Sequence, residues 1–269
     1  MKTAVVITGH LRSGIQNFIH MYEHFFSSHK TDVYIATWNK QENIRGGHEV
    51  IEDHLLPWKK TNLIRSKIYD IDKYNQSKEL FTLDYDRKHS IEDICDLPKH
   101  QIFSMFMNES EEKIRQTHCG FYPEAIEYWN NRIKDQYYLI RQSFNLLNNY
   151  QEYDLILRTR FDFVPLSPME LSVKDDKLTV ATNSPEDPSV SHYDCIQYGQ
   201  PEVMKKYFHL YDHIDDFIDN LSYLNKLSYD RFNAEFMMKY YMEEYGEIKY
   251  DLHLAPHMKE HTNFILQRG

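Results

Sequence analysis

Short apolar runs alternate along the chain with segments whose apolar residues recur at helical spacing. The first run, residues 3–8, is rich in β-branched side chains and ends at Gly9, a pattern typical of a buried parallel strand. Apolar residues at helical spacing follow from Ile15 to Phe26, and a second apolar run covers residues 32–38. A strand, a helix and a strand in this order form a βαβ unit, which predicts a parallel sheet.

The same alternation continues to the end of the chain. Further strands are predicted at residues 66–72, 154–159, 177–182, 195–198 and 248–252, and helices at residues 123–149, 201–213 and 232–245. Residues 75–120 are polar and weakly periodic, which indicates an insertion or a mobile active-site segment. No repeat or Pro/Gly-rich linker divides the sequence. We therefore predict a single α/β domain with a mostly parallel central sheet flanked by helices.

Composition limits the classes of partner. The chain has 269 residues, of which 41% are hydrophobic and 14% aromatic, so it can build a core and is not a disordered chain. Its 31 Lys and Arg residues face 41 Asp and Glu residues, which gives a net charge of −10. An acidic surface repels nucleic acids and anionic membranes, so neither is expected as a partner. Any anionic ligand must therefore meet a local group of basic side chains.

The cysteines and the N-terminus predict a cellular compartment. Cys95, Cys119 and Cys195 show no CxxC spacing, which indicates a reduced chain with neither a disulfide framework nor a cysteine zinc site. Residues 1–9 lead directly into a strand-like run and lack the regions of a signal peptide. No apolar run approaches the roughly 20 residues of a membrane span. We expect a cytoplasmic protein without a transmembrane segment.

The turn after the first strand is a candidate anion site, because ligands of open α/β sheets bind at the carboxyl ends of strands. Gly9 and Gly14 let the backbone turn sharply and approach a ligand, and Arg12 can pair with a phosphate. The spacing matches neither a P-loop nor GxGxxG. An ordinary βα turn with a surface arginine is an equally good interpretation.

Trp38 ends the second predicted strand. A tryptophan at such a position can stack on a nucleotide base, although packing in the core or at its rim is the more common role. Both interpretations remain open at this point.

The most informative segment follows the predicted strand at residues 154–159. Arg158 and Arg160 are two residues apart, so in an extended strand they point to the same side, and Asp162 follows in phase. Guanidinium groups suit phosphate oxygens and a carboxylate suits a cation, so the three side chains together fit a metal-bound diphosphate. An internal Arg–Asp ion pair at a strand end is the alternative.

Seven short runs carry a resemblance to a known family. They lie at residues 5–12, 36–39, 136–140, 153–162, 194–199, 201–207 and 233–241. In content, order and spacing they resemble bacterial and viral glycosyltransferases of the GT-A fold. The resemblance implies a GT-A-like (Rossmann-like) domain with a nucleotide-binding half at residues 1–74, a variable insertion at 75–120 and a diphosphate, metal and acceptor half at 121–269.

The resemblance also implies a nucleoside-diphosphate sugar as donor, a glycan or lipid-linked acceptor, and a role in polysaccharide biosynthesis by transfer of a hexosyl or deoxyhexosyl group. By position, the donor would contact Thr8, Gly9, His10, Arg12, Trp38, Arg158 and Arg160. Mn²⁺ or Mg²⁺ would bind the diphosphate, and Asp162 matches the last carboxylate of the DxD motif of the family. Arg160 replaces the first Asp of that motif and can itself offset diphosphate charge, which would weaken the need for a metal. His257 corresponds to a late histidine that is a metal ligand in some GT-A enzymes.

An inverting transfer also needs a carboxylate that accepts the proton of the acceptor hydroxyl. Asp194 is the first candidate and Glu235 the second, whereas a retaining transfer would need neither. Two other functions stay open: a catalytically degenerate domain that binds glycan or a partner protein, favoured by Arg160 in the motif, and a sugar nucleotidyltransferase. The second is less favoured, because the turn at residues 9–14 has one Arg and no Lys for a triphosphate.

Overall fold

The structure is a computed structural model. It describes residues 1–11, 18–19, 21–23, 31–40, 49–78, 123–161, 163, 171–173, 176–182, 192–215 and 234–254. Within these ranges the side chains of residues 123–132, 182, 192–194, 234–236, 244, 253 and 254 lie outside the description. No helix of the described residues is long and apolar enough to cross a bilayer.

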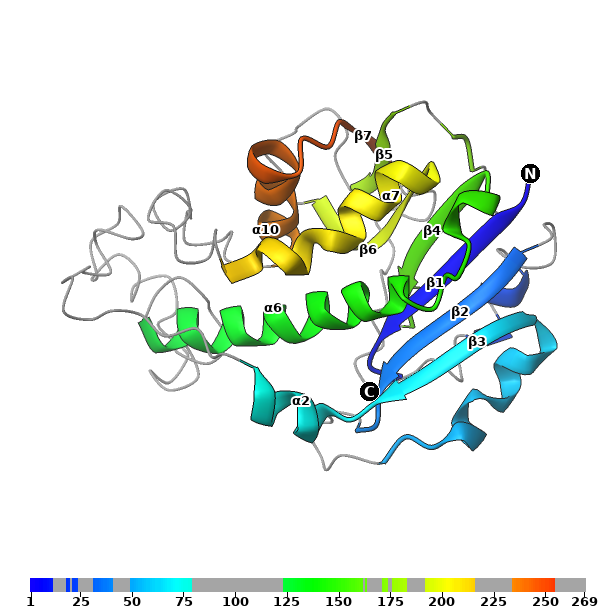
Figure 1. Ribbon diagram of the computed structural model, residues 1–269, viewed down its shortest axis with the longest axis horizontal. Helices are drawn as coiled ribbons and strands as arrows, with labels where there is room; N and C mark the ends of the chain where they lie inside the picture. Colours follow the sequence, from blue (N-terminus) through cyan, green and yellow to red (C-terminus); the bar gives the residue numbers. More distant parts are fainter. Residues whose placement is uncertain are drawn as a thin grey trace, which may run out of the picture.

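A seven-stranded sheet forms the centre of the molecule, in the order β3-β2-β1-β4-β6-β5-β7 (Figure 1). Its strands are β1 (Thr3–Gly9), β2 (Thr31–Trp38), β3 (Asn62–Tyr69), β4 (Leu155–Arg160), β5 (Leu178–Thr182), β6 (His192–Gly199) and β7 (Tyr250–Leu254). Strands β1 to β4 are parallel, β5 is parallel to β7, and β6 is antiparallel to both β4 and β5. The predicted α/β class with a mostly parallel sheet is therefore confirmed, with one reversed strand that the pattern did not reveal.

Helices cover both faces of the sheet. They are η2 (Glu52–Lys60), α2 (Ile71–Ser77), α6 (Pro123–Phe144), η4 (Tyr150–Glu152), α7 (Pro201–Phe208), η5 (His209–His213), α10 (Ala234–Tyr240) and η6 (Tyr241–Tyr245). Figure 1 shows α6, α7 and α10 together on one face. There they pack on alternate residues of β1 such as Ala4 and Val6, whereas Val5 and Ile7 lie on the other side in a cluster with residues of η2 and with the helical residues Phe18 and Met21.

The burial of β1 and of the helix that follows it explains their apolar sequence patterns. Six of the seven residues of β1 are buried, because the strand is covered on both faces and paired on both edges. This environment requires a continuous apolar run, and it is the pattern that the sequence shows. In the following helix Phe18 is buried as predicted, but Ile19 and Tyr22, which were expected on the same core-facing stripe, are exposed, and Met21 is buried instead.

Several predicted boundaries were wrong. The third strand was expected at residues 66–72, but β3 begins at Asn62 and ends at Tyr69. As the edge strand it is largely exposed, so it lacks the apolar run that marks β1. Asp70 ends the strand because its side chain caps α2, which extends into the predicted insertion as far as Ser77. Helix α6 ends at Phe144 rather than at residue 149. Turns at residues 145–149 connect it to η4.

Candidate functional site

The carboxyl ends of the parallel strands meet along one border of the sheet. This border, called the carboxyl edge here, consists of Gly9 of β1, Trp38 of β2, Tyr69 of β3 and Arg160 of β4. Since β6 is antiparallel to β4, its first residues lie beside the end of β4 at the same border. The edge is therefore where ligands of an open α/β sheet bind.

Gly9 and His10 begin the carboxyl edge at β1. Gly9 has φ +117°, a conformation that favours glycine, and a Cβ added there would meet no described atom within 4 Å. The ring of the half-buried His10 is held by a 3.0 Å hydrogen bond between its Nδ1 and the carbonyl oxygen of Lys40, which follows β2. Among the described residues the backbone of the predicted donor turn is thus uncovered at Gly9, and the His10 side chain links the turn to Lys40.

Asn39 and Asp70 join the ends of β2 and β3. The backbone N–H of Asn39 donates to Tyr69 O (2.8 Å), and its side-chain Oδ1 accepts from the N–H of Ile71 (3.0 Å). Asp70 Oδ1 accepts from the N–H groups of Asp72 and Lys73 in the first turn of α2. The hydrogen bond from the Lys73 N–H, with smaller contributions from Asp72, Asn39 and Lys40, holds the pKa of Asp70 below its ordinary value.

We expect the Asp70→Asn variant to be less stable than the parent at pH 7 and equally stable in acid. Asparagine retains the capping hydrogen bonds but loses the charge that favours a helix N-terminus. Because the folded pKa of Asp70 is lowered, its stabilising effect is present above the unfolded aspartate pKa of about 3.9 and is lost as the pH falls through the folded value. Melting temperatures of both proteins between pH 3 and 7 test this; a constant difference across that range would contradict it.

Trp38 lies inside an aromatic cluster rather than at the surface. Its side chain is 1% exposed. Its ring stacks on Tyr138 of α6, with centroids 5.8 Å apart and an interplanar angle of 11°, and it also contacts Tyr74 and Tyr69. Burial raises the pKa of Tyr69 to about 12. This geometry agrees with a packing role for Trp38. Stacking of Trp38 on a nucleotide base stays a prediction, and such stacking would require the aromatic cluster to open.

Arg158 belongs to a buried hydrogen-bond network across three strands. Its Nε donates to Thr8 Oγ1 of β1 (2.9 Å), and its NH1 donates to Gln197 Oε1 of β6 (3.1 Å). Gln197 Oε1 also accepts from the hydroxyl of Tyr207 in α7 (2.9 Å). All four side chains are at most 1% exposed. The network thus brings together two predicted donor residues, Thr8 and Arg158, from neighbouring strands.

Arg160 is the last residue of β4 and is partly exposed. It lies two residues after Arg158 and pairs in register with Thr8. Both arginines therefore lie on the face of the sheet covered by α6, α7 and α10, as the spacing predicted. Immediately afterwards the Phe163 N–H donates to the Arg160 carbonyl (3.3 Å), and Phe161 is buried on the opposite face.

The remaining predicted site residues are placed only in part. Asp194 belongs to the beginning of β6, so its backbone lies at the carboxyl edge, and Glu235 belongs to α10, which packs against β6. The side chains of both lie outside the description. Arg12, Asp162 and His257 lie outside the described residues altogether. Within the described part of the chain, no three His, Cys, Asp or Glu side chains are grouped as metal ligands.

Four residues at or beneath the edge were missed by sequence reasoning. Asn39 directly follows Trp38 and could have been noticed as an amide at a strand end. Gln197 and Tyr207 carry no signal, since a polar residue in an apolar strand and a tyrosine on a helix are both common. Thr37 is fully buried, pairs in register with Gly9, and has a hydroxyl for which the described structure provides no hydrogen-bond partner.

Comparison with known proteins does not identify a family. No protein-family model matches the chain, and no curated protein sequence matches it. What the chain does must therefore be inferred from the fold and from the chemistry of the carboxyl edge.

Proposed function

We propose that the protein is a glycosyltransferase that moves a sugar from a nucleoside diphosphate to a glycan or lipid-linked acceptor. One observation carries the proposal: the pairing of β1 with β4 brings Arg158 and Arg160 beside Thr8 and the open backbone of Gly9. Guanidinium groups are the side chains best suited to bind phosphate oxygens. In a chain of net charge −10, this local group of arginines is where an anionic donor would be attracted.

The architecture supports the same proposal. A mixed sheet with parallel strands β1 to β4 and a reversed β6 is compatible with the GT-A fold that the sequence resembles. The donor would lie across the carboxyl edge, and Asp194, whose backbone lies at that edge, is our candidate base for an inverting transfer. Mn²⁺ or Mg²⁺, if required, would be held by Asp162 and His257 and would offset charge on the leaving diphosphate.

A panel of nucleoside diphosphates tests the proposal. Melting curves with UDP, GDP, CDP and dTDP, each with and without Mn²⁺, should show at least one ligand that raises the melting temperature. A ligand present at about 100 times its Kd adds about 2.7 kcal/mol, which for a chain of this size is an increase of about 5 °C or more. The corresponding sugar nucleotides should then release nucleoside diphosphate. If no nucleotide changes the melting temperature and no sugar nucleotide releases nucleoside diphosphate, the proposal is wrong.

A catalytically degenerate domain is the second candidate, because Arg160 stands where the family motif has its first Asp. The same assays separate the two functions. Binding of a nucleotide followed by sugar transfer or hydrolysis supports the enzyme, whereas glycan binding without any turnover supports the degenerate domain.

A further inference from the structure

The side chain of Arg158 leans toward the carboxyl edge. In the register of the sheet Arg158 pairs with Val6, yet its Nε donates to Thr8, two residues further along β1. Two residues of a strand correspond to roughly 6.6 Å. The Nε end of the guanidinium group thus lies closer to the carboxyl edge than the Arg158 backbone does.

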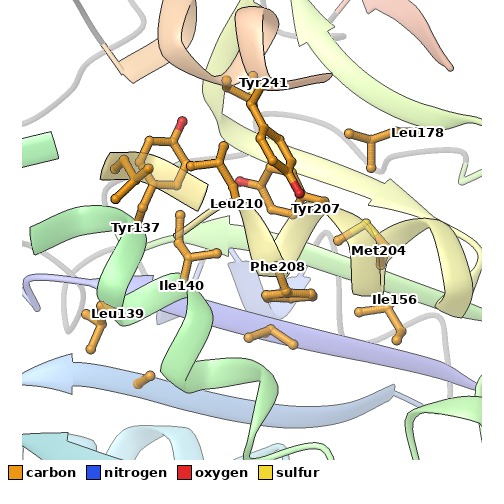
Figure 2. Packing of buried hydrophobic residues seen from close by; sticks show 14 of the residues in the cluster. Tyr137, Leu139, Ile140, Ile156, Leu178, Met204, Tyr207, Phe208, Leu210 and Tyr241 are labelled. Atoms are coloured by element: carbon orange, nitrogen blue, oxygen red, sulfur yellow. The ribbon is translucent and has the colours of Figure 1, made fainter. Parts of the chain in front are cut away.

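Two residues outside the predicted site hold this guanidinium in place. Gln197 lies directly opposite Arg158 on β6, and its Oε1 accepts one hydrogen bond from Arg158 NH1 and one from the Tyr207 hydroxyl. An amide oxygen has two lone pairs, so both are used, and this orients the amide. Tyr207 in turn is fixed by α7, where it packs among Met204, Leu210 and other apolar side chains (Figure 2).

We propose that Gln197 and Tyr207 are positioning residues for the donor site, which hold the buried Arg158 guanidinium toward the diphosphate. The inference rests on the proposed function. Arg158 is 1% exposed, so it acts on a ligand mainly through its charge. The attraction between two opposite charges is strong where water is excluded, and it weakens as the distance between them grows. A shift of the Arg158 guanidinium would therefore change its attraction for the diphosphate.

Tyr207→Phe is the first test, since it removes only the hydroxyl that orients Gln197. The loss of one hydrogen bond from the network should weaken binding of the nucleoside diphosphate by about three- to tenfold. The probes are UDP, GDP and inorganic pyrophosphate, titrated calorimetrically; pyrophosphate retains the charge of the donor without a base. Gln197→Met, which removes the acceptor, should have an equal or larger effect on all probes that bind.

Tyr241→Phe is the matched control. Tyr241 lies in the same apolar cluster (Figure 2), is buried, and donates its hydroxyl to the carbonyl oxygen of Lys206 rather than to Gln197. The two variants should lose similar stability, but only Tyr207→Phe should lose affinity. In an Arg158→Lys background, Tyr207→Phe should have a smaller effect on binding, because lysine lacks the NH1 donor that reaches Gln197.

The outcomes are separable. If the unmodified protein binds neither nucleotide nor pyrophosphate, the proposed function fails, and this inference with it. If the unmodified protein binds a probe and Tyr207→Phe binds it with equal affinity, the proposed function stands and the positioning role is overturned. A matching loss of affinity in Tyr241→Phe would likewise overturn it, since the effect would then follow from general loosening of the cluster.

Discussion

Replacing Trp38 with alanine should lower the free energy of unfolding by about 3 to 5 kcal/mol, the range observed for large aromatic side chains removed from a core. Trp38 is 1% exposed and forms ring contacts with Tyr69, Tyr74 and Tyr138, from β3, α2 and α6. Removal of the indole ring would leave a cavity where the end of β2 meets α6. Tyr138 would then lose further ring contacts as the surrounding side chains shift. Urea denaturation followed by circular dichroism measures the change.

Trp38→Phe is the control that separates packing from ligand binding. It retains one ring and should lose clearly less stability than Trp38→Ala. If packing is the role of Trp38, the phenylalanine variant should bind nucleoside diphosphate with an affinity within about twofold of the parent. A large loss of affinity at full stability would instead favour the predicted contact with the base or ribose. A Trp38→Ala protein as stable as the parent would contradict the packing assignment.

The central strands could be predicted because their environment leaves a strong pattern. Strands β1 and β4 are covered on both faces and hydrogen-bonded on both edges, so nearly all of their residues are buried, and each strand carries an apolar run, at residues 4–7 and 155–157. Edge strand β3 has no such constraint, and its exposed residues gave no indication of where it begins. The direction of β6 was also beyond reach, since direction depends on which strands pair and not on local periodicity.

The candidate site divides in the same way. The spacing of Arg158 and Arg160 is local, because side chains alternate along any strand, so their common face could be predicted. The partners of Arg158 could not, since Thr8, Gln197 and Tyr207 come from three other elements and meet it only through the register of the sheet. For Trp38 the sequence allowed two roles, packing or contact with a nucleotide base. The side chain is buried because α6 packs against β2, and that contact could not be predicted from the sequence.

Replacing Arg160 with alanine should reduce donor affinity about 10- to 100-fold with little loss of stability. Hydrogen bonds to charged groups contribute about 1.5 to 3 kcal/mol each, which corresponds to a change in affinity of this size. Arg160 is partly exposed at the end of β4, so its removal leaves no large cavity. Arg65→Ala is the matched control, because Arg65 is exposed on edge strand β3, where it donates to Asn148 Oδ1. Calorimetric titration with the best nucleotide of the panel gives both affinities.

Arg160→Asp tests why an arginine occupies this position of the motif. If Arg160 offsets diphosphate charge, the reversal should weaken binding without metal even more than alanine does, because a carboxylate repels the phosphate oxygens. The variant also restores the DxD pattern with Asp162, so added Mn²⁺ should recover affinity in Arg160→Asp and should have a smaller effect on the parent protein. Equal responses to Mn²⁺ in the two proteins would show that Arg160 does not substitute for a metal-bound carboxylate, and unchanged affinity in Arg160→Ala would remove Arg160 from the donor site.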